Sequence, residues 1–243
     1  MEWYKHLSRM LVNRDFFSKY EVRELLGEGA FSQVYKIIDK KSQLTYAAKV
    51  VKHKVIVSDR RGVLLMKQEI DIMRQLNHAN IVKLIEVQEV HNAVILVLEL
   101  VPGCELKKIL MTLTFQDVTN ITKAVVNVTA YLESLNIVHR DLKPSNIMIS
   151  AMPGKISTSS VKVIDFGLAA FLSEKLLLVK CGTPGYIAPE ILNTHSKDRI
   201  IVRQNIDVYS VGIILYEMIY KQNPFKDIAN NESRLVVRKN AGN

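Results

Sequence analysis

The spacing of apolar residues along this 243-residue chain changes at Pro102-Gly103, and this change limits the folds that the chain can adopt. Before that point, short apolar runs separated by turns predict strands, and residues 60–76 alone carry apolar side chains at helical spacing. After it, residues 116–135 and 206–220 have the length and spacing of helices. We therefore expect an α+β protein of two lobes, with Pro102-Gly103 as the hinge or linker.

The composition is that of a folded protein with a basic surface. Hydrophobic residues make up 48% and charged residues 23% of the chain, which argues against extensive disorder. The net charge of +9 is compatible with nucleic acid, an anionic membrane or a polyanionic ligand as partner. Because the basic residues are scattered and form no long tract with aromatic residues, we interpret them as a solvated surface and expect no nucleic-acid partner.

The two cysteines and the N-terminus indicate a reducing interior compartment. Cys104 and Cys181 lie far apart and fit neither a disulfide scaffold nor a metal-ligand spacing. The first 17 residues carry charges throughout and no continuous apolar core, so they do not resemble a signal peptide. No apolar run is long enough to span a bilayer. These features predict a cytoplasmic protein, with the nucleus as an alternative and no membrane partner.

Two features of the strand-rich part indicate phosphate binding. Gly27 and Gly29 lie in a turn between predicted strands, where the absence of a Cβ lets backbone N–H groups approach phosphate oxygens. Lys49 is flanked by apolar strand residues, and an unpaired buried ammonium is costly. Nucleotide phosphates, together with Glu69 on the following helix, would balance the positive charge of Lys49. An ordinary hairpin and a solvent-facing lysine on an edge strand are the alternative interpretations.

The segment 137–147, which reads IVHRDLKPSNI, carries the most chemistry. Asp141 can accept or orient the proton of an attacking hydroxyl, Lys143 can steady a phosphoryl group, and Asn146 can bind a metal ion. Further on, Asp165 begins the string DFG and supplies a second oxygen ligand of the kind that Mg²⁺ prefers. A turn-forming aspartate before a glycine is the alternative interpretation of Asp165.

These motifs, with APE at residues 188–190, resemble those of the eukaryotic protein kinase family. Lys143 and the loop Gly182–Tyr186 resemble the serine/threonine type. The strings GEGAFSQV, VPGCEL, CGTPGYIAPE and YEM are similar to those of the calcium/calmodulin-dependent group. The resemblance covers roughly residues 20–227 and implies a bilobal kinase fold with ATP in a cleft near Val101. It implies transfer of the γ-phosphate of ATP to Ser or Thr hydroxyls of protein substrates.

The resemblance also implies roles for individual residues. Asp141, Lys143 and Thr183 would be catalytic, and Asn146 and Asp165 would hold Mg²⁺. The implied ATP-binding residues are Leu26, Gly27, Gly29, Phe31, Ser32, Val34, Ala47, Lys49, Glu69, Leu98, Glu99, Val101, Glu105 and Met148. One of these, Ser32, replaces the third glycine of the family's pattern.

Two glutamates suggest a substrate preference. Glu105 and Glu217 lie where related kinases recognise an arginine upstream of the target residue. We therefore expect basic residues N-terminal to the target Ser or Thr. Two solvated helix carboxylates are the alternative interpretation.

We assign residues 1–19 to an N-terminal extension, either a docking arm or a disordered tail. Residues 20–101 form the N-lobe, with one main helix. Residues 102–243 form a C-lobe that lacks the last three helices of the family. Truncation is the favoured explanation, with a splice form or a required partner as alternatives. A non-catalytic kinase-like scaffold, or an inactive fragment, is the rival to an active enzyme.

Two further departures from the family bear on regulation and stability. Val179 stands where many members have a phosphorylatable threonine, so Arg140 would lack its usual phosphate partner. We expect activity without phosphorylation there, and the alternative is a substitute site such as Ser173. The missing helices would include the arginine that pairs with Glu190. A buried Glu190 without a partner would cost about 3–5 kcal/mol.

Overall fold

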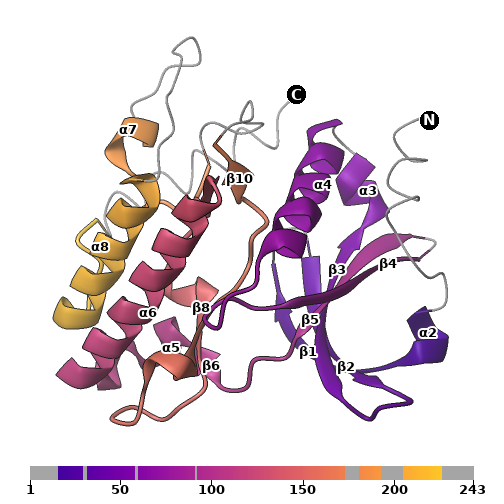
Figure 1. The fold of residues 1–243 in the computed structure, drawn as a ribbon, viewed down its shortest axis with the longest axis horizontal. Helices are drawn as coiled ribbons and strands as arrows, with labels where there is room; N and C mark the ends of the chain where they lie inside the picture. The colour runs from indigo at the N-terminus through magenta and orange to yellow at the C-terminus, as the bar shows by residue number, and fades with distance from the viewer. Residues whose placement is uncertain are drawn as a thin grey trace. The chain divides into compact units, whose positions relative to one another are not determined.

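The structure, a computed structural model, describes residues 16–29, 32–57, 60–90, 92–172, 181–192 and 205–225. The chain divides into two units (Figure 1). The strand unit comprises the residues up to Asn77 together with Val82–Val101, and the helix unit comprises His78–Ile81 together with the residues from Pro102 onward. The predicted α+β class is confirmed. The predictions of an N-terminal arm and a shortened C-lobe bear mainly on residues 1–15 and 226–243, which lie outside the described ranges.

An antiparallel sheet forms the body of the strand unit. Its strands, in spatial order, are β1 (Tyr20–Glu28), β2 (Ser32–Asp39), β3 (Thr45–Lys52), β5 (Ala93–Glu99) and β4 (Leu84–Val90). Helices α3 (His53–Val57) and α4 (Arg60–Gln75) connect β3 to β4. Because side chains alternate along a strand, the sheet has two apolar faces. On one face, Met66 and Ile70 of α4 pack with Val51, Val87 and Leu96.

The other face of the sheet is covered by α2 (Phe16–Lys19), which directly precedes β1. Phe16 is only 2% exposed and packs with Tyr20 against Ile37 and other apolar residues of the sheet. Glu86 on β4 accepts hydrogen bonds from Lys19 Nζ at 2.8 Å and from Tyr20 Oη at 2.7 Å. Among the described residues, packing against the sheet therefore includes Phe16, which precedes the domain boundary that the sequence suggests at Tyr20.

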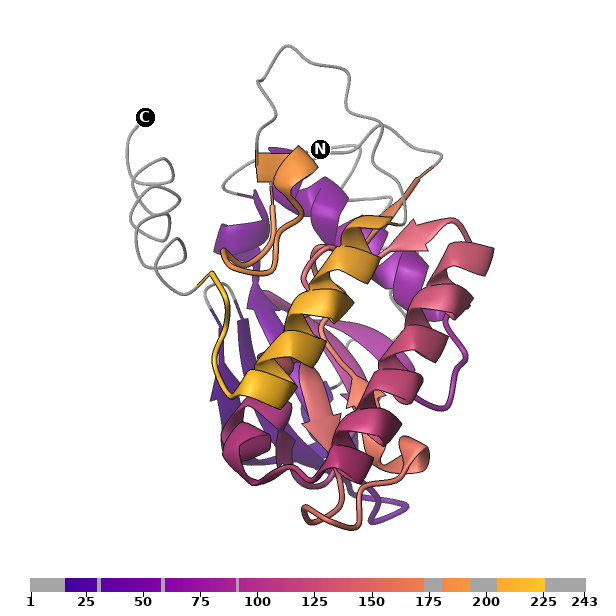
Figure 2. The ribbon, with the colours of Figure 1, turned by 90° about the vertical axis from the view of Figure 1, so that its left-hand side faces the viewer.

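The helix unit is built on two long helices, α6 (Phe115–Ser134) and α8 (Asn205–Tyr220), which lie side by side in both ribbon views (Figures 1 and 2). Short strands form two small sheets, one in the order β6-β8-β9 and one of β10 with β7. The remaining bounds are β6 (Cys104–Glu105), α5 (Leu106–Ile109), η1 (Leu110–Thr112), β7 (Ile137–Val138), η2 (Pro144–Asn146), β8 (Ile147–Ile149), η3 (Thr158–Ser160), β9 (Val161–Val163), β10 (Ala170–Phe171) and α7 (Pro189–Leu192).

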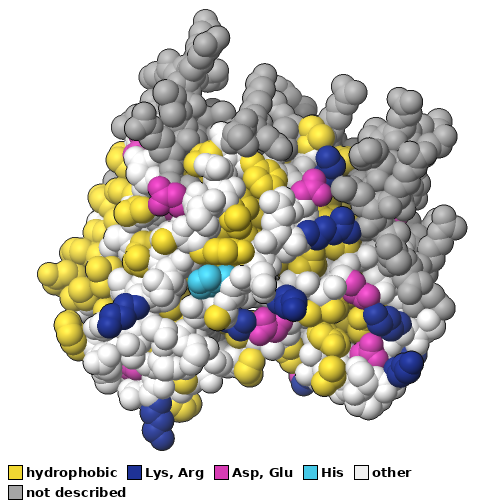
Figure 3. Space-filling view, viewed as in Figure 1, with side chains coloured by type: hydrophobic (Ala, Val, Ile, Leu, Met, Phe, Trp, Pro, Cys, Tyr) yellow, Lys and Arg dark blue, Asp and Glu magenta, His cyan; other side chains and the backbone are white. Residues whose placement is uncertain are grey.

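Two surface properties follow from the described residues alone. On the face drawn in Figure 3, their Lys and Arg side chains stand among polar and hydrophobic ones and form no single continuous basic patch. None of the helices within the described ranges combines the length and apolarity that crossing a bilayer requires.

Asp117 joins the start of α6 to the loop between β8 and β9. It completes a capping box with Thr114 and also accepts hydrogen bonds from Gly154 N at 2.7 Å and Ile156 N at 3.1 Å. The residue is 1% exposed. Burial alone would raise the pKa of its carboxyl, but the hydrogen bonds from Thr114, Gly154 and Ile156 together hold that pKa below its ordinary value. The charged form of Asp117 therefore contributes to folding.

Replacing Asp117 with asparagine should destabilise the protein at neutral pH by about 1–3 kcal/mol, because one acceptor for the buried N–H groups is lost. A carboxyl with a lowered folded pKa contributes stability above its unfolded pKa, which is about 4, and loses it as the pH falls. The difference between wild type and Asp117→Asn should therefore narrow in acid. Urea unfolding across this pH range measures the difference, with Asp71→Asn on α4, a partly exposed carboxylate 3.7 Å from Lys67, as the control. A difference that does not depend on pH would contradict the account.

Candidate active site

The loop that follows β7 is fixed by a carboxylate on α8. Asp207 has no exposed surface, and its two oxygens accept hydrogen bonds from His139 N at 2.6 Å and Arg140 N at 2.9 Å. Burial raises the pKa of Asp207, whereas nearby His139 and Arg140 favour its charged form. Arg140 has a φ of +66°, a conformation that a non-glycine residue rarely adopts without support. The bonds to Asp207 supply that support and set the direction of the chain toward Asp141.

Three predicted site residues converge on a fourth, Asp141. Thr183 Oγ1 donates to Asp141 Oδ1 at 2.6 Å, and Lys143 Nζ donates to Asp141 Oδ2 at 2.8 Å. Lys143 Nζ also donates to Thr183 Oγ1 at 2.7 Å, and Asn146 Nδ2 donates to Asp141 Oδ2 at 3.1 Å. The Asp141 side chain keeps 11% of its surface exposed. The cluster thus places a carboxylate, a cation, a hydroxyl and an amide around one point of the helix unit.

Asp165, the other predicted metal ligand, lies just after β9 in the same unit. Ile164 N donates to Asn146 O at 2.9 Å, so the main chain ties the two segments together. Asp165 has a φ of +61° and is exposed, while the neighbouring Phe166 is buried with its ring 4.7 Å from that of His139. In the described part of the chain, no three His, Cys, Asp or Glu side chains group into a metal cage. The side-chain oxygens of Asn146 and Asp165 are of the kind that Mg²⁺ binds together with water and substrate oxygens.

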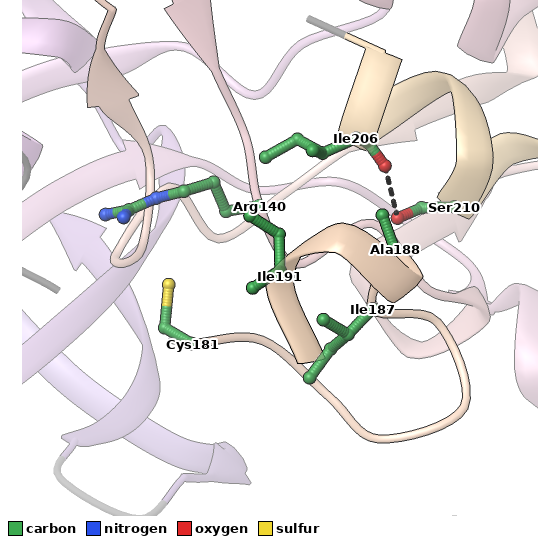
Figure 4. A pocket seen from close by; sticks show the side chains of 7 residues that line it. All are labelled: Arg140, Cys181, Ile187, Ala188, Ile191, Ile206 and Ser210. Carbon is green, nitrogen blue, oxygen red and sulfur yellow. Dashed lines mark hydrogen bonds between the residues drawn. The ribbon is translucent and has the colours of Figure 1, made fainter. Parts of the chain in front are cut away.

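The Arg140 side chain lies beside a cavity (Figure 4). The cavity is lined by Arg140, Cys181, Ile187, Ala188, Ile191, Ile206 and Ser210. Arg140 Nε donates to Leu168 O at 2.6 Å, and burial raises the pKa of the Cys181 thiol, which keeps it uncharged. A backbone carbonyl thus contacts this guanidinium. Ser173 and Val179, on which the expectations about loop phosphorylation depend, lie outside the described residues.

One stability expectation is wrong. The sequence suggested that Glu190 is a buried carboxylate without a partner. In the structure Glu190, on α7, is exposed and accepts a hydrogen bond from Asn205 Nδ2 at 3.0 Å. Because an exposed carboxylate keeps its hydration, the large penalty of a buried unpaired charge does not arise.

The predicted ATP-binding residues fall into two groups by unit. In the strand unit, Lys49 Nζ donates to Glu69 Oε1 at 2.7 Å, and their side chains are only 13% and 9% exposed, so the expected ion pair is present. The same unit holds Leu26 and Gly27 on β1, Gly29 just after β1, Ser32 and Val34 on β2, Ala47 on β3, Leu98 and Glu99 on β5, and Val101 just beyond β5. In the helix unit, Glu105 and Met148 are direct partners across β6 and β8. Phe31 lies outside the described residues.

The turn between β1 and β2 does not need its glycines for folding. A Cβ at Gly27 would meet no atom within 4 Å, and at Gly29 it would lie 3.4 Å from Ser32 Oγ, an ordinary contact. Neither residue has a positive φ. Gly103 differs, because its φ is +103° and a Cβ there would lie 2.0 Å from Ile149 O. The fold requires Gly103, whereas Gly27 and Gly29 leave space on the outside of the turn.

The comparisons with known proteins agree with the fold. The family model of the protein kinase domain matches residues 20–241. The chain is 38% identical over 210 residues to "Myosin light chain kinase A" of Dictyostelium discoideum, an alignment covering 85% of this chain and 68% of that protein. It is 36% identical over 221 residues to human "Calcium/calmodulin-dependent protein kinase type 1B", covering 90% and 61%. It is 34% identical over 224 residues to human "Serine/threonine-protein kinase H1", covering 90% and 50%.

The chain therefore belongs to the protein kinase family. Its relatives include kinases named for serine/threonine specificity and for calcium/calmodulin dependence, so the predicted serine/threonine type and the similarity to the calcium/calmodulin-dependent group are confirmed. The enzyme class to which the chain belongs is therefore that of the ATP-dependent protein kinases. The chain spans between half and about two thirds of the length of these relatives.

Two matched glycine substitutions test whether the fold requires Gly103 but not Gly27. Gly103→Ala should lower the free energy of unfolding by at least about 1–3 kcal/mol, because the new Cβ meets a carbonyl and the backbone is strained. Gly27→Ala should change it by less than about 1 kcal/mol. Thermal unfolding of both variants beside wild type measures the difference. Equal losses in the two variants would show that Gly27 also serves the fold.

Proposed function

We propose that this chain transfers the γ-phosphoryl group of ATP to Ser or Thr hydroxyls of protein substrates, with Asp141 at the reacting hydroxyl. The observation that carries the proposal is the convergence of Lys143, Asn146 and Thr183 on the Asp141 carboxylate. Phosphoryl transfer depends mainly on positioning and on charge stabilisation, and this cluster supplies both.

In the proposed reaction, the oxygen of the substrate hydroxyl bonds to the γ-phosphorus, and Asp141 accepts the proton of that hydroxyl. The bond from that phosphorus to the bridging oxygen breaks, and ADP leaves with the bond's electron pair. Lys143, 2.8 Å from Asp141, balances charge on the transferring group. Thr183 holds the other carboxylate oxygen and so orients it.

Asn146 and Asp165 are the proposed ligands of Mg²⁺. When bound, the ion would neutralise the phosphate oxygens of ATP. The main-chain hydrogen bond from Ile164 to Asn146 supports this pairing, because it connects the segments that carry the two ligands. In the strand unit, Lys49 is the proposed phosphate contact, oriented by Glu69, and the open space at Gly27 and Gly29 is proposed to admit phosphate oxygens.

The remaining nucleotide contacts are proposed by family resemblance. The apolar residues Leu26, Val34, Ala47, Leu98 and Met148 would pack on the adenine ring. The backbone of Glu99 and Val101 would bond to its edge, and Glu105 would reach the ribose. One detail of the structure bears on these roles: Glu99 N donates to Lys83 O at 2.9 Å, so this N–H already has a partner.

Substitution of Asp141 and of Gly27 should separate transfer from binding. Asp141→Asn should bind Mg-ATP like wild type but lose phosphotransfer by about 10²–10⁴-fold, because the proton acceptor is gone. Gly27→Ala should fold normally but bind Mg-ATP more weakly, because the added Cβ would occupy the space proposed for phosphate oxygens. Calorimetry measures binding, and labelled-phosphate transfer to a Ser or Thr peptide measures turnover. A folded Asp141→Asn protein with unchanged turnover would rule out the proposed role of Asp141.

For substrates, we propose a preference for basic residues N-terminal to the target. Glu105 supports it, because its side chain is 36% exposed and its carboxylate is only loosely paired with Lys108 at 3.7 Å. In a positional peptide library, arginine or lysine should be enriched upstream of the phosphorylated residue, and Glu105→Gln should reduce that enrichment. A library with no upstream basic enrichment would contradict the preference.

We also propose that the protein acts in the cytoplasm or nucleus, without nucleic acid or membrane as partner. Cys104 and Cys181 are free thiols in the structure, which supports a reducing compartment.

A further inference from the structure

The junction of α2 and β1 is held on one face of the strand unit's sheet, here called the α2 face. The apolar cluster on this face contains Phe16, Tyr20, Ile37, Ala48, Ile95 and Val97. Strands β1 and β4 are opposite edges of the sheet, yet Lys19 and Tyr20 both donate hydrogen bonds to Glu86 on β4. After β2, Lys40 N donates to Lys19 O at 2.9 Å, and Lys40 Nζ donates to Phe17 O at 2.8 Å. The described chain therefore begins on the α2 face, and the residues before α2 must start from it.

Gln88 is a buried polar residue on the same face. It lies on β4 between Glu86 and Val90, and because side chains alternate along a strand, all three point to the α2 face. Gln88 has no exposed surface, although β4 is an edge strand. Its Nε2 donates to Glu86 Oε1 at 2.7 Å, which turns its Oε1 away from that carboxylate. Among the described residues, this buried Oε1 has no hydrogen-bond donor.

A buried acceptor without a donor is rare in folded proteins, because it loses its bonds to water and gains none in return. We therefore expect the donor for Gln88 to come from outside the described ranges. Two such parts of the chain are close to this face in sequence: residues 1–15, which lead directly into α2, and His91, which follows β4. The sequence of the first part favours it as the source of the donor.

Residues 3–11 have the sequence pattern of an amphipathic helix. The apolar side chains at positions i, i+4, i+7 and i+8, which share one side of a helix, are Trp3, Leu7, Met10 and Leu11. Lys5 and Arg9 fall on the opposite side. So short a helix is stable only when a partner buries its apolar side. The indole N–H of Trp3 can only donate, and it needs an acceptor when the ring is buried.

We propose that residues 3–11, here called the N-terminal arm, dock as a helix on the α2 face beside β4, with the Trp3 indole N–H donating to Gln88 Oε1. The two sides match, because the arm has a donor and an apolar stripe to bury, and the face has a buried acceptor and an edge strand to cover. A helix over residues 3–11 is about 13 Å long, and residues 12–15 connect it to α2. The docked arm holds α2 where it joins the two edges of the sheet. The inference does not depend on the proposed function.

Intrinsic fluorescence reports on the arm alone, because Trp3 is the one tryptophan of the chain. In the native 243-residue chain, we expect emission at a shorter wavelength than in denaturant and weak quenching by iodide, both independent of protein concentration. Leu7→Ala, on the apolar side of the arm, should make Trp3 more accessible to iodide. Lys5→Ala, on the opposite side, is the matched control and should leave the quenching unchanged.

A double-mutant cycle tests the contact between Trp3 and Gln88. Trp3→Phe keeps an aromatic ring but removes the donor, so the equilibrium constant for unfolding should rise about tenfold. Gln88→Leu removes the acceptor, and in that background Trp3→Phe should raise the constant by less than about twofold. Urea unfolding followed by circular dichroism measures all four proteins, because Trp3→Phe removes the fluorophore. His91→Ala should show no coupling to Gln88→Leu.

The results that would overturn the proposal are distinct. A Trp3 ring that is open to iodide in the native chain would show that the arm is not docked. Protection that appears only at high protein concentration would show that a second copy covers the arm. If Trp3→Phe has the same effect in both backgrounds, its indole does not bond to Gln88, and coupling to His91→Ala instead would place the donor after β4. If Gln88→Leu does not fold, the quenching of Leu7→Ala against that of Lys5→Ala decides.

Discussion

The carboxylate of Asp207, fully buried near the start of α8, is the contact on which the rest of the helix unit depends. It accepts the backbone N–H groups of His139 and Arg140 and so supports the left-handed conformation of Arg140. A buried carboxylate is favourable only when hydrogen-bond donors surround it, and removing one partner of such a group is costly. The direction of the chain at Asp141 is therefore set by a side chain 66 positions away in sequence.

The same helix organises the second loop of the site. Asp207 fixes the loop of Asp141, and Ser210 and Glu217 hold the loop of Thr183. The two loops then meet through the hydrogen bond from Thr183 to Asp141. An apolar helix with polar side chains at selected positions thus acts as a scaffold that positions the candidate catalytic groups, as rigid elements do in enzymes that work by positioning.

Much of the site could be predicted from sequence because its residues are close together in the chain or have a chemistry that requires a partner. Asp141, Lys143 and Asn146 lie within six residues, and a lysine in an apolar strand requires an anion, which Glu69 supplies. Contacts between distant segments could not be predicted. Nothing in the sequence pairs Tyr186 with Glu217, indicates that Phe16 covers one face of the sheet, or shows that Glu190 is exposed. These depend on tertiary packing, which a local pattern does not encode.

The central proposal is that Asn146 and Asp165 of the helix unit hold the Mg²⁺ of Mg-ATP and that Asp141 acts on the hydroxyl that receives the γ-phosphate. A crystal structure with Mg²⁺ and a non-hydrolysable ATP analogue tests it most directly. The account predicts oxygens of Asn146 and Asp165 in the coordination shell of the ion, Lys49 Nζ on a phosphate, and the Thr183–Asp141 hydrogen bond intact. An analogue bound away from these residues, or an ion held by other ligands, would contradict it.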